Sequence, residues 1–76
     1  MSYCHPGDDS DVYVIASRNP RINRSILQCY CIPARSFLSR SRMIAHLIQH
    51  LKAGEMVPDR AFLRLLREIR EEGDEL

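Results

Sequence analysis

The first half of the chain has the alternating pattern of β-strands. Residues 11–17 read Asp-Val-Tyr-Val-Ile-Ala-Ser, a run rich in β-branched and aromatic side chains. Residues 25–32 predict a second strand, and side chains on a strand alternate between its two faces. One face of this second strand therefore carries Leu27, Cys29 and Cys31. Turn-forming residues separate the two runs, so we expect an antiparallel hairpin with an arginine-rich tip.

The second half of the chain predicts two amphipathic helices. Ser39 is a suitable N-cap for the first helix, and Gly54 is a suitable residue to end it. Between them, apolar residues recur at helical spacing: Met43, Ile44, Leu47, Ile48 and Leu51. Pro58 suits the first turn of a second helix, which Gly73 ends. The apolar face of that helix could pack on the first through Phe62, Leu65, Leu66 and Ile69.

Two thiols and two imidazoles lie on this framework at metal-ligand spacing. His46 and His50 are four residues apart, so they share one face of the first helix. Cys29 and Cys31 are two residues apart, so on a strand they point to the same side, although both reach one ion only if the chain bends at Tyr30. Two cysteines with two histidines form the ligand set of a structural zinc site. We therefore predict that all four bind Zn²⁺; the alternative is a pair of partly exposed histidines on an amphipathic helix.

The run from Phe37 to His50 resembles the second half of a Cys2His2 zinc finger. In that family an aromatic and an aliphatic residue, here Phe37 and Met43, pack under the metal beside the two histidines. The chain departs from the family in its Cys-x-Cys spacer and in the 14 residues between Cys31 and His46, where about 12 are usual. The predicted hairpin and helices give an α+β fold, a ββα zinc-finger-like unit with an appended C-terminal helix. The whole chain is also similar to small proteins of unknown function from phages of actinobacteria, a likeness that implies no activity.

A chain of 76 residues predicts one small domain. So short a chain buries only about 60% of its unfolded surface and often needs a staple, which a metal would supply. We expect a zinc-stapled domain over residues 11–73, a flexible lead over residues 1–10 and a frayed tail over residues 74–76. Cys4 and His5 could serve as auxiliary ligands, although terminal residues more often have no such role.

The N-terminal segment has neither the basic start nor the apolar run of a signal peptide. No apolar stretch approaches the roughly 20 residues that span a membrane. These absences predict a cytoplasmic protein without membrane contact, in the host cytoplasm if a phage encodes it.

The net charge of +1 hides a strong segregation. Residues 18–52 contain seven basic side chains and no acid, whereas residues 53–76 contain four arginines and seven acids. A basic segment of this kind indicates contact with nucleic acid or another acidic partner. The alternative is a solvated segment whose arginines pair with the acidic C-terminal helix. The candidate phosphate-binding residues are Arg18, Arg21, Arg24, Arg35, Arg40 and Arg42.

An enzyme is the least favoured class of function. Four protein ligands close a zinc site to water, and residues 18–52 provide no carboxylate near it. A Cys–His nucleophile pair is the enzymatic alternative. We expect no small-molecule substrate. The favoured function is interaction with another protein or self-association through apolar helix surface; the alternative is binding of DNA or RNA by residues 18–52.

Overall fold

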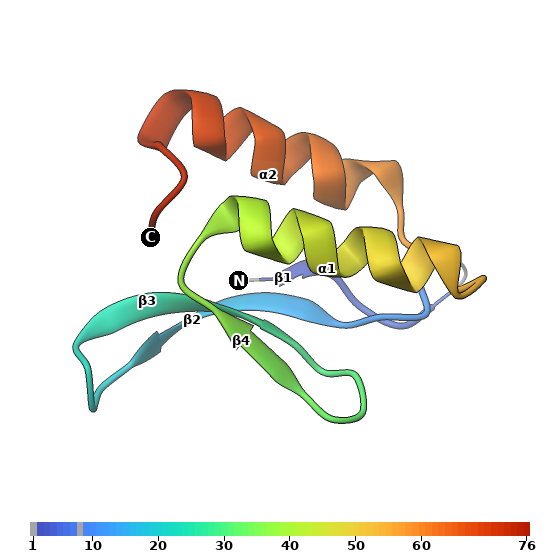
Figure 1. The fold of residues 1–76 in the computed structure, drawn as a ribbon, viewed down its shortest axis with the longest axis horizontal. Helices are drawn as coiled ribbons and strands as arrows, with labels where there is room; N and C mark the ends of the chain where they lie inside the picture. The colour runs from blue at the N-terminus through green and yellow to red at the C-terminus, as the bar shows by residue number, and fades with distance from the viewer. Residues whose placement is uncertain (1, 8) are drawn as a thin grey trace.

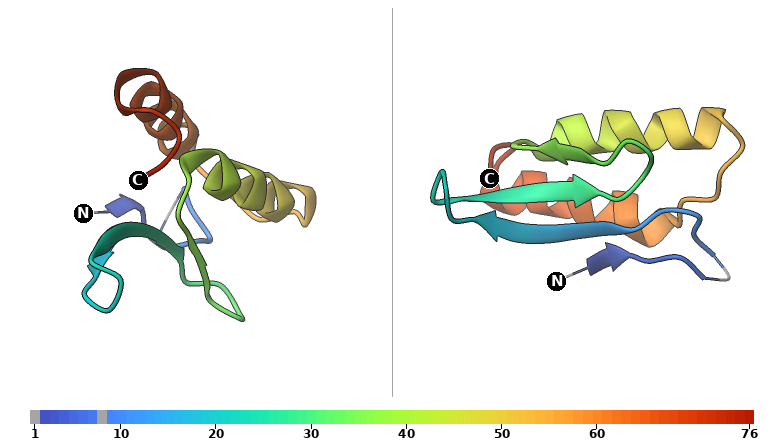
Figure 2. Two further views of the ribbon diagram at one scale, coloured as in Figure 1. Left: turned by 60° about the vertical axis from the view of Figure 1, so that its left-hand side comes forward. Right: turned by 90° about the horizontal axis from the view of Figure 1, so that it is seen from below.

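The structure is a computed structural model that describes residues 2–7 and 9–76, so positions 1 and 8 of the predicted lead lie outside it. The fold is α+β, a four-stranded antiparallel sheet followed by two helices (Figure 1). In chain order and also in sheet order, the strands are β1 (Ser2–Cys4), β2 (Val14–Asn19), β3 (Arg24–Cys29) and β4 (Arg35–Phe37). The helices α1 (Arg40–Lys52) and α2 (Asp59–Glu72) lie side by side over one face of the sheet (Figure 2).

The predicted central hairpin is confirmed. Strands β2 and β3 pair antiparallel from Val14 opposite Cys29 to Asn19 opposite Arg24. The side chains of Val14, Leu27 and Cys29 are fully buried, so the face predicted from the alternation is the face that meets the helices. The sequence therefore predicted the pairing and the buried face of the central strands, although β2 begins three residues later and β3 ends three residues earlier than expected.

The two edge strands differ from the prediction. Strand β4 lies between β3 and α1, so the chain does not have the ββα order of a zinc finger. Strand β1 pairs with β2 and buries Tyr3 and Cys4 inside the segment expected to be a flexible lead. Each edge strand has only three residues, too few for an alternating pattern to distinguish it from a loop.

The helices begin and end near the predicted residues. The Ser39 hydroxyl accepts a hydrogen bond from the Arg42 amide at 3.2 Å and caps α1. Gly54 follows the end of α1 with a positive φ of 88°, a conformation that favours glycine. Helix α2 buries Ala61 and the predicted Leu65 in the core, and the predicted Phe62 packs against it, whereas Leu66 is exposed and not buried as the apolar pattern predicted.

The C-terminal tail, expected to fray, is hydrogen bonded over the beginning of α1. The Arg40 amide donates to the Asp74 carbonyl at 2.8 Å, and the Leu76 amide donates to the Leu38 carbonyl at 3.1 Å. The Asp74 carboxylate accepts from the Ser41 amide at 2.7 Å, and this bond keeps the pKa of Asp74 below its usual value. Because α1 has no acid in its own first turn, Asp74 supplies the negative charge that a helix N-terminus favours.

Neither helix in the described part of the chain has the length and hydropathy that crossing a bilayer requires.

Candidate metal centre

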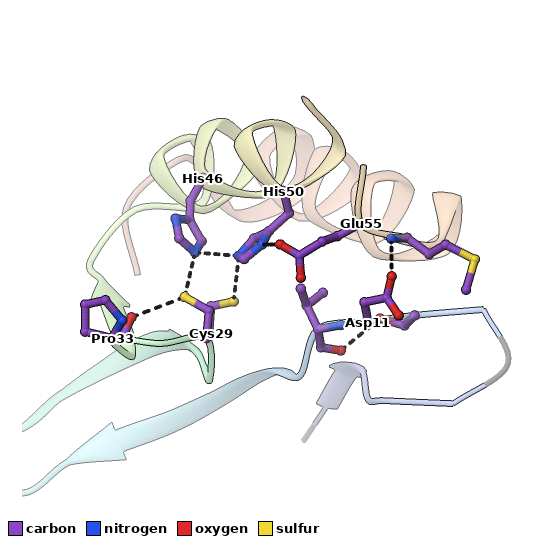
Figure 3. A network of polar contacts seen from close by, with 10 residues as sticks. Asp11, Cys29, Pro33, His46, His50 and Glu55 are labelled. Carbon is purple, nitrogen blue, oxygen red and sulfur yellow. Dashed lines mark hydrogen bonds and ion pairs between the residues drawn. The ribbon is translucent and has the colours of Figure 1, made fainter. Parts of the chain in front are cut away.

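The structure brings together all four predicted ligands, although they come from two layers of the fold. Cys29 is the last residue of β3, and Cys31 follows it in the bend over residues 31–33. His46 and His50 lie one turn apart on the face of α1 that meets this end of the sheet (Figure 3). Among the described residues these four are the one group of His, Cys, Asp or Glu whose donor atoms converge, all within 4.8 Å of one another.

Three of the six distances between the donor atoms are close to those of a tetrahedral site. Cys29 Sγ lies 3.6 Å from His50 Nε2, and Cys31 Sγ lies 3.4 Å from His46 Nε2. The two Nε2 atoms are 3.1 Å apart. Around an ion with ordinary Zn–S and Zn–N bonds, sulfur and nitrogen would be about 3.6 Å apart and the two nitrogens about 3.3 Å apart. The site therefore needs only small adjustments to hold such an ion.

Glu55 adds a contact that the sequence analysis missed. Its Oε1 lies 2.8 Å from Nδ1 of His50. Because a carboxylate only accepts hydrogen bonds, Nδ1 is the donor, and Nε2 of the neutral ring then presents a lone pair to the other ligands. A carboxylate behind a ligating histidine is a recurrent feature of metal sites, where it fixes the tautomer and the orientation of the ring. Glu55 lies only five residues after His50 in the sequence, but the turn after α1 is what brings its carboxylate back to the ring.

Backbone contacts hold the two segments that carry these groups. The Met56 amide donates to the Asp11 carboxylate at 2.7 Å, and the Asp11 amide donates to the Met56 carbonyl at 2.8 Å (Figure 3). This pair fixes the segment that contains Glu55. The Tyr30 amide donates to the Tyr13 carbonyl at 2.9 Å, and the two rings stack with centroids 5.3 Å apart. The chain between Cys29 and Cys31 is therefore anchored to the neighbouring segment.

Burial in the site favours the neutral forms of Cys29 and His46. Burial, followed by the neighbouring Cys31, raises the pKa of the Cys29 thiol to about 12. Burial, followed by the charge of His50, lowers the pKa of His46 and keeps its imidazole neutral. A divalent ion opposes the effect of burial on Cys29, because it stabilises the thiolate directly, whereas the lowered pKa of His46 already favours the neutral imidazole that binds a metal.

No family model, curated protein or solved structure matches the chain. Neither resemblance described above is therefore supported by a match. The likeness to Cys2His2 zinc fingers consists of the ligand set itself and of Phe37 and Met43. Met43 is fully buried, and the Phe37 ring lies 5.2 Å from that of His46, which is the packing that the likeness implies.

The six predicted phosphate-binding arginines do not form one group. Arg40 is buried, and its Nε donates to Glu68 at 3.2 Å while its Nη1 donates to the Gly73 carbonyl at 2.9 Å. It therefore ties α1 to α2 and is not available to an external phosphate, because its guanidinium already has partners inside the protein. The other five are exposed, and none of them pairs with an acidic side chain within the described residues: Arg18, Arg21, Arg24, Arg35 and Arg42. Arg18 donates to Asn23, and Arg24 donates to the main-chain oxygen of Leu76.

Cys4 and His5, considered as auxiliary ligands, lie outside the group of converging donor atoms. Cys4 is buried in the core on β1, whereas His5 is exposed just after that strand.

Proposed function

We propose that the protein binds one zinc ion through Cys29, Cys31, His46 and His50, and that the ion serves as a structural staple. The observation that carries this proposal is the convergence of the four donor atoms within 4.8 Å of one another, with three of the six distances close to tetrahedral values. Zinc is favoured over other ions because two thiolates and two imidazoles form a typical zinc ligand set. Cys31, His46 and His50 also border a surface hollow, which provides a path of entry for the ion.

The staple would join the sheet to the helical layer. Cys29 and Cys31 belong to the end of the hairpin, whereas both histidines belong to α1, so an ion between them cross-links the two layers. In a chain of this size, the free energy of metal binding is a large part of the free energy of folding. With four protein ligands, no coordination position is left for a substrate or a reactive water, which supports a role without catalysis.

The function that we propose for the stapled domain is interaction with another protein chain. Several large apolar side chains remain exposed on the helices, above all Leu51, Leu63 and Leu66. Exposed apolar side chains that lie together mark interaction surfaces more often than single ones do.

Binding of DNA or RNA is the second candidate, supported by the five exposed arginines that lack ion pairs within the described residues. Three of them lie in or beside the turn between β2 and β3, where no acid lies nearby in the sequence: Arg18, Arg21 and Arg24. Such a group would give affinity for phosphates without a choice of sequence.

Metal analysis of the purified protein tests the proposal. We expect about one zinc per chain, and we expect a chelator to unfold the domain because the metal and the fold are linked. Cys31→Ser and His46→Ala should each lose the ion, whereas the matched control His5→Ala, an exposed histidine outside the site, should keep it. A folded wild-type protein without metal that takes up no added zinc would overturn the proposed site.

A further inference from the structure

An apolar surface lies along the outer side of the two helices. A shallow groove between α1 and α2 is lined by Ile48, Leu51, Phe62 and Leu63, and Leu66 extends the surface along α2. Leu63 is 65% exposed and Leu66 is 53% exposed, whereas Leu65 between them is fully buried in the core. Helix α2 therefore has one apolar face turned to the sheet and a second turned to solvent. We call this second face, with Ile48 and Leu51 of α1, the outer helix surface.

Charged residues flank the centre of the outer helix surface symmetrically. Asp59 precedes Leu63 by four residues, and Arg70 follows Leu66 by four residues. The positions 59, 63, 66 and 70 have the spacing of 4, 3 and 4 residues that forms the seam between packed helices. Asp59 and Arg70 form no ion pair among the described residues, so both charges are available to a partner.

We infer that the outer helix surface binds a second copy of the same chain, with the two α2 helices antiparallel. In this arrangement Leu63 faces the partner's Leu66, and Asp59 faces the partner's Arg70. A two-fold axis between the helices makes each contact occur twice. A parallel arrangement would instead place Asp59 against Asp59 and Arg70 against Arg70, which like charges disfavour.

The self-complementary pattern identifies the second copy as the occupant. An acid and a base at equal distances from the apolar centre make this surface complementary to itself after a two-fold rotation, which is what an interface between two copies of one chain needs. The inference rests on the proposed function, because it names the partner of the interaction module. The metal ligands come from β3, the bend after it and α1, and none of them lines the groove, so the two can be tested separately.

The first test measures the oligomeric state of the zinc-loaded full chain by sedimentation velocity, from micromolar to millimolar concentration. We expect a concentration-dependent dimer and no larger species, since a two-fold interface is closed. Leu63→Glu places a charge in the centre of the interface and should raise the dimer dissociation constant by at least about tenfold. The control Ile22→Glu changes an exposed apolar residue in the β2–β3 turn, 49% exposed, and should dimerise as the wild type does.

A charge exchange tests the antiparallel arrangement. Asp59→Arg and Arg70→Asp should each weaken the homodimer by about tenfold, because each brings like charges together at both ends of the interface. An equimolar mixture of the two variants should form a dimer at least as stable as the wild type, since every facing pair is then of opposite charge. This comparison needs no apolar substitution, and circular dichroism checks that each variant is folded.

Two results would overturn the inference: a zinc-loaded wild type that stays monomeric at millimolar concentration, or variants at Leu63, Asp59 and Arg70 that all dimerise as the wild type does. The zinc content of every sample separates this failure from failure of the proposed metal site. A monomer with one zinc per chain rejects the dimer alone, and a dimer without zinc rejects the metal site alone.

Discussion

Glu55 provides a sharp test of the metal centre, because it contacts a ligand without being one of the four. Its hydrogen bond with Nδ1 of His50, at 2.8 Å, holds the ring with Nε2 towards the other donors. Glu55→Ala removes this acceptor and frees the His50 ring to change tautomer or to rotate. Loss of such an outer contact costs about 10- to 100-fold in metal affinity. Because the Glu55 side chain is 43% exposed, water can replace part of the lost bond, and we expect the lower end of that range, about 1.4–2 kcal/mol.

The assay is a competition for zinc between the protein and a chromophoric chelator. Glu55→Gln keeps an uncharged oxygen acceptor and should lose less affinity than Glu55→Ala. The control Glu71→Ala removes an exposed carboxylate of α2 and should bind zinc as the wild type does. The spectrum of the Co²⁺-substituted protein should be nearly the same in all variants, since the four ligands are retained.

Two outcomes would refute this reasoning. If Glu55→Ala binds zinc as tightly as the wild type, the carboxylate does not orient His50. If the cobalt spectrum of Glu55→Ala shows a changed ligand set, then Glu55 coordinates the ion itself.

Three further predictions follow from the core, the ionisable groups and the basic turn. Leu65→Ala should lower the free energy of unfolding by about 2–5 kcal/mol, whereas Leu66→Ala should lower it by much less, because only Leu65 is fully buried. Chemical denaturation of both variants measures this difference. Burial, followed by the hydrogen bond to Glu68, raises the pKa of Tyr3 from 10.0 to about 12, so its contribution to stability should be present below pH 10 and be lost as the pH rises towards 12. Tyr3→Phe lacks this titration, so the wild type should lose stability relative to the variant as the pH rises from 10 to 12. Stability–pH curves of the same shape for both proteins would contradict this prediction. If the protein binds nucleic acid, the logarithm of its affinity should fall with the logarithm of the salt concentration, with a slope of about −0.9 per phosphate contacted in duplex DNA. Replacing Arg18, Arg21 and Arg24 together with serine should make that slope less steep, as a fluorescence titration can measure.

The central hairpin and both helices could be predicted because each is long enough to show its period. Alternation over residues 11–17 and 25–32 gave the buried face, and the N-cap and the two glycines gave the helix ends. Helical periodicity did not separate Leu65 from Leu66, because a wide apolar stripe does not show which part of it meets the core. The three-residue edge strands could not be predicted, since their pairing depends on long-range contacts with β2 and β3.

The histidine pair of the candidate site could be predicted because residues four apart on a helix share one face. Cys31 reaches the site from the bend after β3, so strand alternation does not account for its position, although the ligand set itself was read from the sequence. Glu55 was missed because the turn after α1 brings it back to His50, and local sequence does not reveal that return. Arg40 was assigned to the basic surface because its charge is visible in the sequence while its burial against Glu68 is not. The ion pair joins residues 28 positions apart and depends on the packing of α1 on α2.

The short edge strands also affect how the protein behaves at high concentration. An unpaired strand edge can template the addition of another chain, and long, flat, hydrophobic edges are the most prone to this. Strands β1 and β4 each offer only three residues, β1 is followed closely by Pro6, and β4 begins with the charged Arg35 two residues after Pro33. Both edges of the open sheet are therefore poor templates for the edge-to-edge addition of further chains.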